Sequence, residues 1–205
     1  MSTSETRASE TRALARSLLD LCKARKLTIA TAESCTGGLV SAALTDIPGS
    51  SAVVICGYVT YADDAKAGML GVNHDTLANF GAVSKETALA MAHGALKRSK
   101  TAISVATTGI AGPGGATPGK PVGLVHFAAA AQDGRVIHRE KRFGAIGRSA
   151  VRQRSVIEAL KMLTELARAP KPVKPTKPLA PSSIRSRAVR KSRKRPGARR
   201  RPARG

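Results

Sequence analysis

Apolar and polar residues follow two different periodicities along the first 168 residues of this chain. Three segments place apolar residues at helical spacing: 10–26, 84–98 and 148–168. Three short apolar runs between them are typical of buried strands: 27–32, 51–61 and 101–107. Residues 1–9 are polar and are expected to fray. The pattern therefore predicts strands that alternate with amphipathic helices.

Two further apolar runs flank the dipeptide Asp133-Gly134, a common two-residue hairpin turn. They predict an antiparallel pair formed by 122–131 and 135–143. Short helices are expected at 62–70 and 75–80. Strands that alternate with helices up to a terminal hairpin predict an α/β fold, a three-layer α/β/α sandwich with a mixed, mostly parallel sheet.

The pattern stops after Ala169, where the composition changes. Fourteen of the 35 Lys and Arg residues and seven of the 11 prolines lie in 170–205, which has no acidic residue. Most of the net charge of +22 therefore belongs to this segment. Such a sequence cannot bury a core, so we expect a folded domain at 1–169 and a disordered basic tail at 170–205.

The remaining composition indicates a cytoplasmic protein. No apolar run has the length of a membrane span, and the first residues carry acids and lack the apolar core of a signal peptide. Three cysteines without metal-type spacing fit a reducing compartment. The four histidines are scattered, so no metal site is expected.

The stretch Thr31–Gly38 is the strongest candidate for a site, because it joins a predicted strand to a predicted helix through a glycine-rich turn. Ser34 and Thr36 place hydroxyl groups in this turn, and free N–H groups at a helix start can bind an anion or an oxyanion. Gly37 and Gly38 allow close approach of the backbone to a ligand. An ordinary strand–helix connection with a Ser or Thr cap would show the same pattern.

Ser34 would need a neighbouring base to act as a nucleophile. Lys66 is the candidate, because a lysine in apolar surroundings releases its proton more readily. Tyr58 could donate a hydrogen bond nearby. The alternative is that Lys66 is a solvated helix residue and Tyr58 a core residue. Cys35 is the intrinsically better nucleophile, but a small buried thiol is the commoner outcome.

Two other features carry less information. The stretch Gly114–Lys120 matches the spacing of a phosphate-binding loop, G-x-x-x-x-G-K. Pro121 stands where that loop needs Ser or Thr, and a strand follows where a helix should. A nucleoside triphosphatase is therefore rejected. Glu33 adjoins Ser34 in sequence. Pairing of its carboxylate with a helix dipole explains an acidic residue at this position as well as a catalytic role does.

Several motifs in order resemble the nicotinamide-nucleotide amidohydrolase family, also known as the CinA C-terminal domain family. The resemblance covers about residues 8–168 and rests on six stretches: Thr31–Gly38 (TAESCTGG), Asp46–Ser51 (DIPGSS), Gly57–Lys66 (GYVTYADDAK), Gly81–Ser84 (GAVS), Thr108–Gly115 (TGIAGPGG) and Lys120–Gly123 (KPVG). Their number and order make the match specific, although no single one would.

The resemblance implies hydrolysis of the carboxamide of nicotinamide mononucleotide to nicotinate mononucleotide and ammonia, without a cofactor. It also implies an α/β/α sandwich and homo-oligomers. The implied catalytic residues are Ser34, Lys66 and Tyr58. From the chemistry of amide hydrolysis, we expect the N–H groups of Thr36, Gly37 and Gly38 to receive the oxyanion. We expect Thr108, Gly109, Gly112 and Arg148 to bind the rest of the substrate, with donors for its phosphate from the Gly109–Gly115 loop and Arg148.

The chain departs from the family pattern in two places. Relatives often carry Phe-x-Gly-Asp-Arg before the last helix, whereas Phe143–Arg148 is one residue longer and lacks the Asp. The basic tail is also outside the pattern, and it could bind nucleic acid without sequence preference. A catalytically weak protein associated with nucleic acid is therefore the alternative function.

Overall fold

The computed structural model describes residues 3–169, with side chains from Glu5 onward. The segment 170–205, expected to form the tail, lies outside the described residues. The described strands are β1 (Ile29–Glu33), β2 (Val54–Val59), β3 (Ile103–Gly109), β4 (Leu124–Ala131) and β5 (Val136–Arg142). They form one sheet in the order β2-β1-β3-β4-β5.

The sheet is mixed, with a parallel half and an antiparallel half. β1 runs parallel to both of its neighbours, and Ala32 lies opposite Tyr58 on one side and Ala106 on the other. β4 is antiparallel to β3 and to β5. The predicted hairpin and the predicted mixed sheet are both confirmed.

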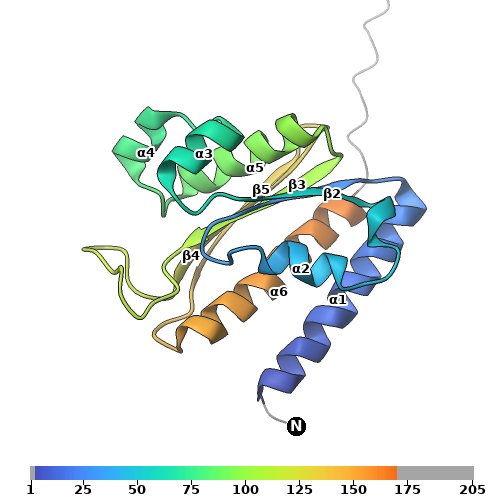
Figure 1. The fold of residues 1–205 in the computed structure, drawn as a ribbon, viewed down its shortest axis with the longest axis horizontal. Coiled ribbons are helices and arrows are strands. Elements are labelled where there is room, and N and C mark those ends of the chain that lie inside the picture. Colours follow the sequence, from blue (N-terminus) through green and yellow to red (C-terminus); the bar gives the residue numbers. More distant parts are fainter. Residues whose placement is uncertain (1–2, 170–205) are drawn as a thin grey trace, which may run out of the picture. The chain divides into compact units, whose positions relative to one another are not determined.

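Helices cover both faces of this sheet, which confirms the α/β/α sandwich (Figure 1). The helical segments are α1 (Thr3–Arg25), α2 (Leu39–Thr45), the 3₁₀ turn η1 (Ser50–Ala52), α3 (Asp63–Leu70), α4 (His74–Phe80), α5 (Lys85–Ser99) and α6 (Arg148–Arg168). α1, α2 and α6 lie on one face, and α3, α4 and α5 lie on the other.

The two cores between these layers differ in side-chain size. Leu18, Phe127 and Leu160 are fully buried on the α1/α6 face. The α5 face is built largely from alanines, which let α5 approach the sheet closely. α5 also packs tightly on α3, because a Cβ atom at Gly94 would lie 2.2 Å from the carbonyl oxygen of Leu70.

The expectation of fraying is wrong for residues 3–9, because α1 begins at Thr3. The first turns are polar but have tertiary partners, since Arg7 donates a 2.9 Å hydrogen bond to Gln153 of α6. Packing against α6 therefore extends the helix past the apolar repeat that the sequence shows.

The expectation that the run 51–61 forms a buried strand is also wrong. β2 is an edge strand, and the side chains of Ile55 and Val59 are 53% and 46% exposed. An apolar run without alternation cannot distinguish an edge strand from a central one, because position in the sheet is a property of the tertiary structure.

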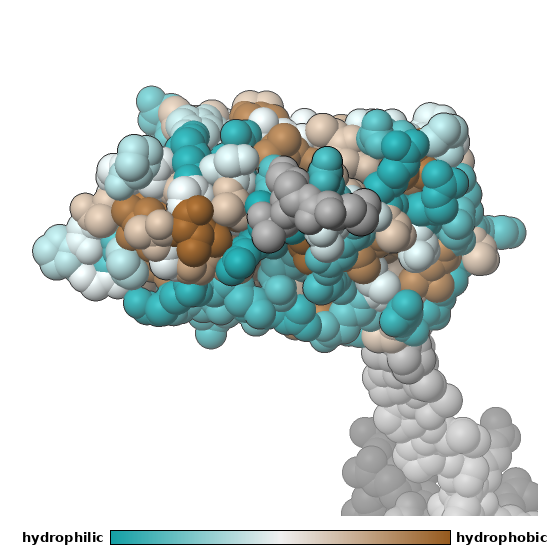
Figure 2. All heavy atoms as spheres, turned by 90° about the horizontal axis from the view of Figure 1, so that it is seen from below, coloured by the Kyte–Doolittle hydropathy of each residue, from teal (hydrophilic) through white to brown (hydrophobic). Residues whose placement is uncertain are grey.

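Polar residues dominate the surface of the α1/α6 layer, where apolar residues form only scattered groups (Figure 2). Among residues 3–169, no helix combines the length and the apolar character needed to cross a bilayer.

Candidate functional site

The candidate residues gather where the parallel strands end. β1, β2 and β3 run in the same direction, so the turns that follow them lie at one edge of the sheet. Ligands bind at this edge in open α/β sheets. The turn after β1 carries Ser34, the turn after β2 leads to Lys66, and the loop after β3 contains the second glycine-rich motif.

The backbone of the Ser34 turn is fixed by two hydrogen bonds. The N–H of Ser34 donates to the carbonyl oxygen of Thr107 at 2.9 Å, and the N–H of Gly37 donates to that of Ser34 at 3.1 Å. Gly37 and Gly38 have φ of +59° and +93°, a region that favours glycine. The two glycines are therefore required by the turn itself, whether or not a ligand approaches.

Glu33 holds the start of α2. Its buried carboxylate accepts hydrogen bonds from the N–H of Val40 at 3.0 Å and the N–H of Ser41 at 2.8 Å, and from the hydroxyls of Ser41 and Thr31. These bonds satisfy helix N–H groups that would otherwise lack partners. The helix-pairing interpretation of Glu33 is confirmed, and these two N–H groups are not the oxyanion donors.

Thr36 connects the turn to β3 and α6. Its hydroxyl lies 2.7 Å from the hydroxyl of Thr107, and both side chains are fully buried. Its carbonyl oxygen accepts a 2.8 Å hydrogen bond from Arg152. The Thr36 hydroxyl is therefore engaged in a structural contact.

Cys35 belongs to the apolar cluster on the α1/α6 face of the sheet and is 5% exposed. Burial raises the pKa of its thiol to about 12, despite an opposing effect of the nearby Arg152. The thiolate is the nucleophilic form of cysteine, so this residue is inert at neutral pH. Ser34, at 9% exposure, is the remaining candidate nucleophile of the turn.

Lys66 is 1% exposed in the middle of α3, contrary to a solvated helix lysine. Its Nζ donates to the carbonyl oxygens of Tyr61 at 3.2 Å and Ala62 at 3.4 Å, and to the carboxylate of Asp63 at 3.2 Å. Thr60, just before these acceptors, donates its N–H to the carbonyl oxygen of Glu33. This chain of contacts brings the amine to the edge of the sheet that bears Ser34.

The two tyrosines of the GYVTY motif occupy different surroundings. Tyr58 lies on the α5 face of β2, where burial and a hydrogen bond with Cys56 raise its pKa to about 12. Tyr61 is 60% exposed, and its hydroxyl accepts a 3.0 Å hydrogen bond from Arg148. Tyr61 therefore contacts both Lys66 and Arg148. The sequence analysis assigned the tyrosine of the site to Tyr58 and did not identify Tyr61.

The loop after β3 supplies backbone contacts. Thr108 donates its hydroxyl to the carbonyl oxygen of Ala82 at 2.6 Å. Gly109 has no room for a side chain, since a Cβ atom would lie 2.6 Å from the carbonyl oxygen of Leu124. Gly112 accepts a 3.1 Å hydrogen bond from Arg148. Arg148 thus bridges this loop and Tyr61.

Sequence reasoning missed two polar atoms in this region. The Thr60 hydroxyl and the Arg152 Nε are buried, and the described residues provide neither with a hydrogen-bond partner. Unpaired buried polar atoms are uncommon and mark places where a ligand or water would bind. No periodicity or spacing signals them, because their burial results from packing between segments far apart in sequence.

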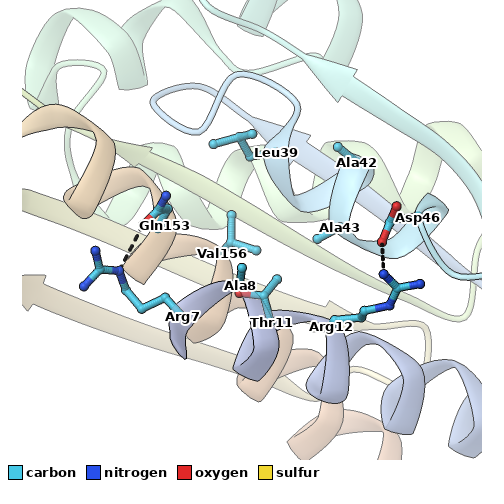
Figure 3. A pocket seen from close by; sticks show the side chains of 10 residues that line it. All are labelled: Arg7, Ala8, Thr11, Arg12, Leu39, Ala42, Ala43, Asp46, Gln153 and Val156. Atoms are coloured by element: carbon cyan, nitrogen blue, oxygen red, sulfur yellow. Dashed lines mark hydrogen bonds and ion pairs between the residues drawn. The ribbon is translucent and has the colours of Figure 1, made fainter. Parts of the chain in front are cut away.

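Residues 3–169 contain no cluster of His, Cys, Asp or Glu side chains suited to a metal ion. A cavity of about 360 Å³ lies between α1, α2 and α6 and is lined by none of the candidate residues (Figure 3). Its polar groups pair with each other, Arg7 with Gln153 and Arg12 with Asp46. None of the residues assigned to the site by sequence therefore takes part in this cavity.

Known proteins share both the sequence and the fold. The model of the CinA C-terminal domain matches residues 11–167. A CinA-like protein of Mycobacterium sp. (strain MCS) is 55% identical over 136 residues, 66% of this chain and 32% of the relative. The chain thus spans about a third of the length of the curated relatives it matches.

Two solved structures illustrate the likeness. The competence/damage inducible protein CihA from Agrobacterium tumefaciens is 55% identical, with a TM-score of 0.76 over 77% of this chain and 95% of that chain. A competence-damaged protein (CinA) superfamily member from Enterobacter cloacae is 32% identical, with a TM-score of 0.72 over 77% and 92%. The resemblance found in the motifs is confirmed: the chain belongs to the CinA C-terminal domain family.

Proposed function

We propose that this protein hydrolyses the carboxamide of nicotinamide mononucleotide to nicotinate mononucleotide and ammonia. The observation that carries the proposal is that Ser34 and the buried Lys66 both follow parallel strands that end at one edge of the sheet, with Arg148 hydrogen-bonded to Tyr61 after β2 and to Gly112 after β3. A primary amide needs a nucleophile, oxyanion donors and a proton for the departing ammonia.

In the proposed reaction, the Ser34 oxygen attacks the carboxamide carbon while its proton passes to Lys66. The tetrahedral oxyanion is received by N–H groups of the turn. Thr36 and Gly38 are the candidate donors, because the N–H of Gly37 is bound to the carbonyl of Ser34. Lys66 then returns the proton to the nitrogen, the C–N bond breaks and ammonia leaves. Water hydrolyses the acyl-serine to the carboxylate.

Asp63 and the two carbonyl groups on Lys66 hold its Nζ in place through this cycle. Three acceptors suit an ammonium, and a neutral amine can still donate two of the three hydrogen bonds. Arg148 is the proposed donor to the substrate phosphate, since a guanidinium binds phosphate well. Thr108, Gly109 and Gly112 shape the pocket through their backbone.

Release of ammonia from nicotinamide mononucleotide by the purified full chain tests the proposal. Ser34→Ala and Lys66→Met should each lower the rate on the order of a thousandfold or more, because each breaks one proton-transfer unit. Ser51→Ala and Lys85→Met remove the same groups from exposed positions and should leave the rate unchanged. A folded wild type without amide hydrolysis, or an active Ser34→Ala variant, would overturn it.

The second candidate is a catalytically weak protein that associates with nucleic acid. The fourteen basic residues after Ala169, without one acid, favour it. Counterion release from nucleic acid would drive such binding. An inactive wild type that binds DNA through this segment would favour the second function over the first.

A further inference from the structure

The side chain of Arg152 extends from α6 to the glycine-rich turn after β1. Its Nη2 donates a 2.8 Å hydrogen bond to the carbonyl oxygen of Thr36. The N–H of Leu39 donates to the same oxygen at the longer distance of 3.3 Å. A Cβ atom at Gly37 would lie 3.2 Å from this Nη2. The guanidinium therefore packs directly against the peptide that joins Thr36 to Gly37.

This peptide is held at both of its polar atoms. Arg152 binds its C=O group, and its N–H group donates to the carbonyl oxygen of Ser34 at 3.1 Å. A planar peptide fixed at both atoms resists rotation, although Gly37 and Gly38 give the backbone of the turn unusual freedom. The N–H groups of Thr36 and Gly38, the candidate oxyanion donors, belong to the two adjoining peptides. Their directions therefore depend on the contact with Arg152.

The polar partners of Arg152 do not balance its charge. Its Nε is buried and has no hydrogen-bond partner among residues 3–169. In the same part of the chain, none of the ion pairs includes Arg152. A neutral donor would suffice to hold a carbonyl oxygen, and a buried N–H group without an acceptor costs free energy. The positive charge is therefore available to a negative charge that forms nearby.

The charge of Arg152 acts on the turn that carries Ser34. Burial raises the pKa of the Cys35 thiol, and Arg152 is one of the groups that oppose this rise. A negative charge at Cys35 is thus favoured by Arg152, and Ser34 is the adjacent residue in the chain. Such interactions are stronger in a site that excludes water than in solution.

We propose that Arg152 is a positioning residue for the oxyanion. It fixes the peptide that directs the N–H groups of Thr36 and Gly38, and its charge stabilises the negative charge of the tetrahedral intermediate. The inference rests on the proposed amide hydrolysis at Ser34. Arg148 lies one turn earlier on α6 and binds the loop after β3 instead, so the two arginines have separate roles.

Kinetics of the full chain with nicotinamide mononucleotide test this role. Arg152→Gln keeps a neutral donor and should lower kcat about a hundredfold, with KM changed less than about threefold, because Arg152 acts on the turn and not on the substrate. Arg152→Lys keeps the charge and should retain kcat within about tenfold of the wild type. Arg154→Gln, at an exposed position on the same helix, is the matched control and should leave kcat unchanged.

Two kinetic outcomes would overturn the role of Arg152. A purely structural tie to the carbonyl of Thr36 predicts equal kcat values for the Gln and Lys variants, since both can donate a hydrogen bond. A loss confined to KM would show that Arg152 binds the substrate and does not position the oxyanion donors. Thermal unfolding of each variant confirms that the rates are measured on folded protein.

Labelling of Ser34 separates this inference from the proposed function. A fluorophosphonate probe reacts with a serine nucleophile, and its phosphoryl oxygen takes the position of the oxyanion. Mass spectrometry should show labelling of the wild type at Ser34 and labelling slowed about a hundredfold in Arg152→Gln. The same slowing in a wild type that does not hydrolyse nicotinamide mononucleotide would support Arg152 and refute only the proposed function. A wild type unlabelled at Ser34, or equal labelling rates, would overturn the role of Arg152.

Discussion

The hydroxyl of Tyr61 accepts a 3.0 Å hydrogen bond from the Nη2 of Arg148, although 87 residues separate them in the chain. The carbonyl oxygen of the same tyrosine holds the Nζ of Lys66. Tyr61 thus joins the amine of Lys66, which is proposed as the base, to the guanidinium of Arg148, which is proposed as the phosphate donor.

We expect Tyr61→Phe to lower kcat/KM for nicotinamide mononucleotide about tenfold, a loss of about 1.4 kcal/mol of transition-state stabilisation. The change removes the Arg148 contact and keeps the carbonyl on Lys66. The stability should stay within about 0.5 kcal/mol, because the side chain is exposed. Tyr58→Phe is the matched control and should retain activity. The reverse result would return the role to Tyr58.

Cys35 should be dispensable for catalysis. Because burial raises the pKa of its thiol to about 12, we expect iodoacetamide at pH 8 to leave it unmodified, while the half-buried Cys56 reacts. Peptide mass mapping after timed alkylation measures this order. Cys35→Ala should keep most of the hydrolysis rate. Inactivation that tracks alkylation of Cys35 and is blocked by substrate would identify Cys35 as the nucleophile instead.

Glu33→Gln should destabilise the fold rather than alter the chemistry directly. An amide cannot accept at both of its terminal atoms, so the N–H of Val40 or of Ser41 loses its acceptor. Losing one hydrogen bond to a buried charged group costs about 2 kcal/mol, measurable by urea unfolding. Glu10→Gln, at an exposed ion pair with Lys161, should cost less than about 0.5 kcal/mol. Equal stability of the two variants would contradict this role of Glu33.

The stacked pair His126 and His138 should make stability depend on pH. Burial lowers the pKa of both rings, and Glu140 partly opposes this effect. A lowered pKa in the folded state means that the unfolded chain binds more protons below about pH 6.5, so stability is full above that pH and falls as the pH decreases.

Thermal unfolding between pH 7.5 and 5.5 measures this dependence. His126→Gln should flatten the decline in Tm toward acid pH. His93→Gln, at an exposed position on α5, should leave the slope unchanged. A wild-type Tm that rises on acidification, or equal slopes for wild type and His126→Gln, would contradict the assignment.

The segment after Ala169 should dominate binding to polyanions. A variant that ends at Ala169 loses fourteen basic residues, so we expect its affinity for DNA to fall and the salt dependence of binding to become shallower. Its rate of amide hydrolysis should match that of the full chain. Fluorescence anisotropy with a labelled duplex at low and moderate salt measures the first quantity. Unchanged DNA affinity would exclude the segment as an anchor.

Element types were readable from the sequence because each follows a local rule. The predicted helical segment 84–98 corresponds to α5, which Ser84 caps by accepting a hydrogen bond from the N–H of Thr87. The Asp133-Gly134 hairpin also formed as predicted. Edge and centre positions were not readable, because β2 and β3 are both apolar runs and only pairing distinguishes them. The early start of α1 likewise depends on contacts with α6.

The sequence by itself determined the α/β order of elements, the family and the two glycine-rich turns, because these follow from periodicity and from motifs read along the chain. Only the tertiary structure decided what surrounds each functional group. It buried Cys35 and Lys66, engaged Glu33 with α2, and placed Tyr61 against Arg148. Burial and hydrogen-bond partners arise where segments distant in sequence pack together, so no local pattern encodes them.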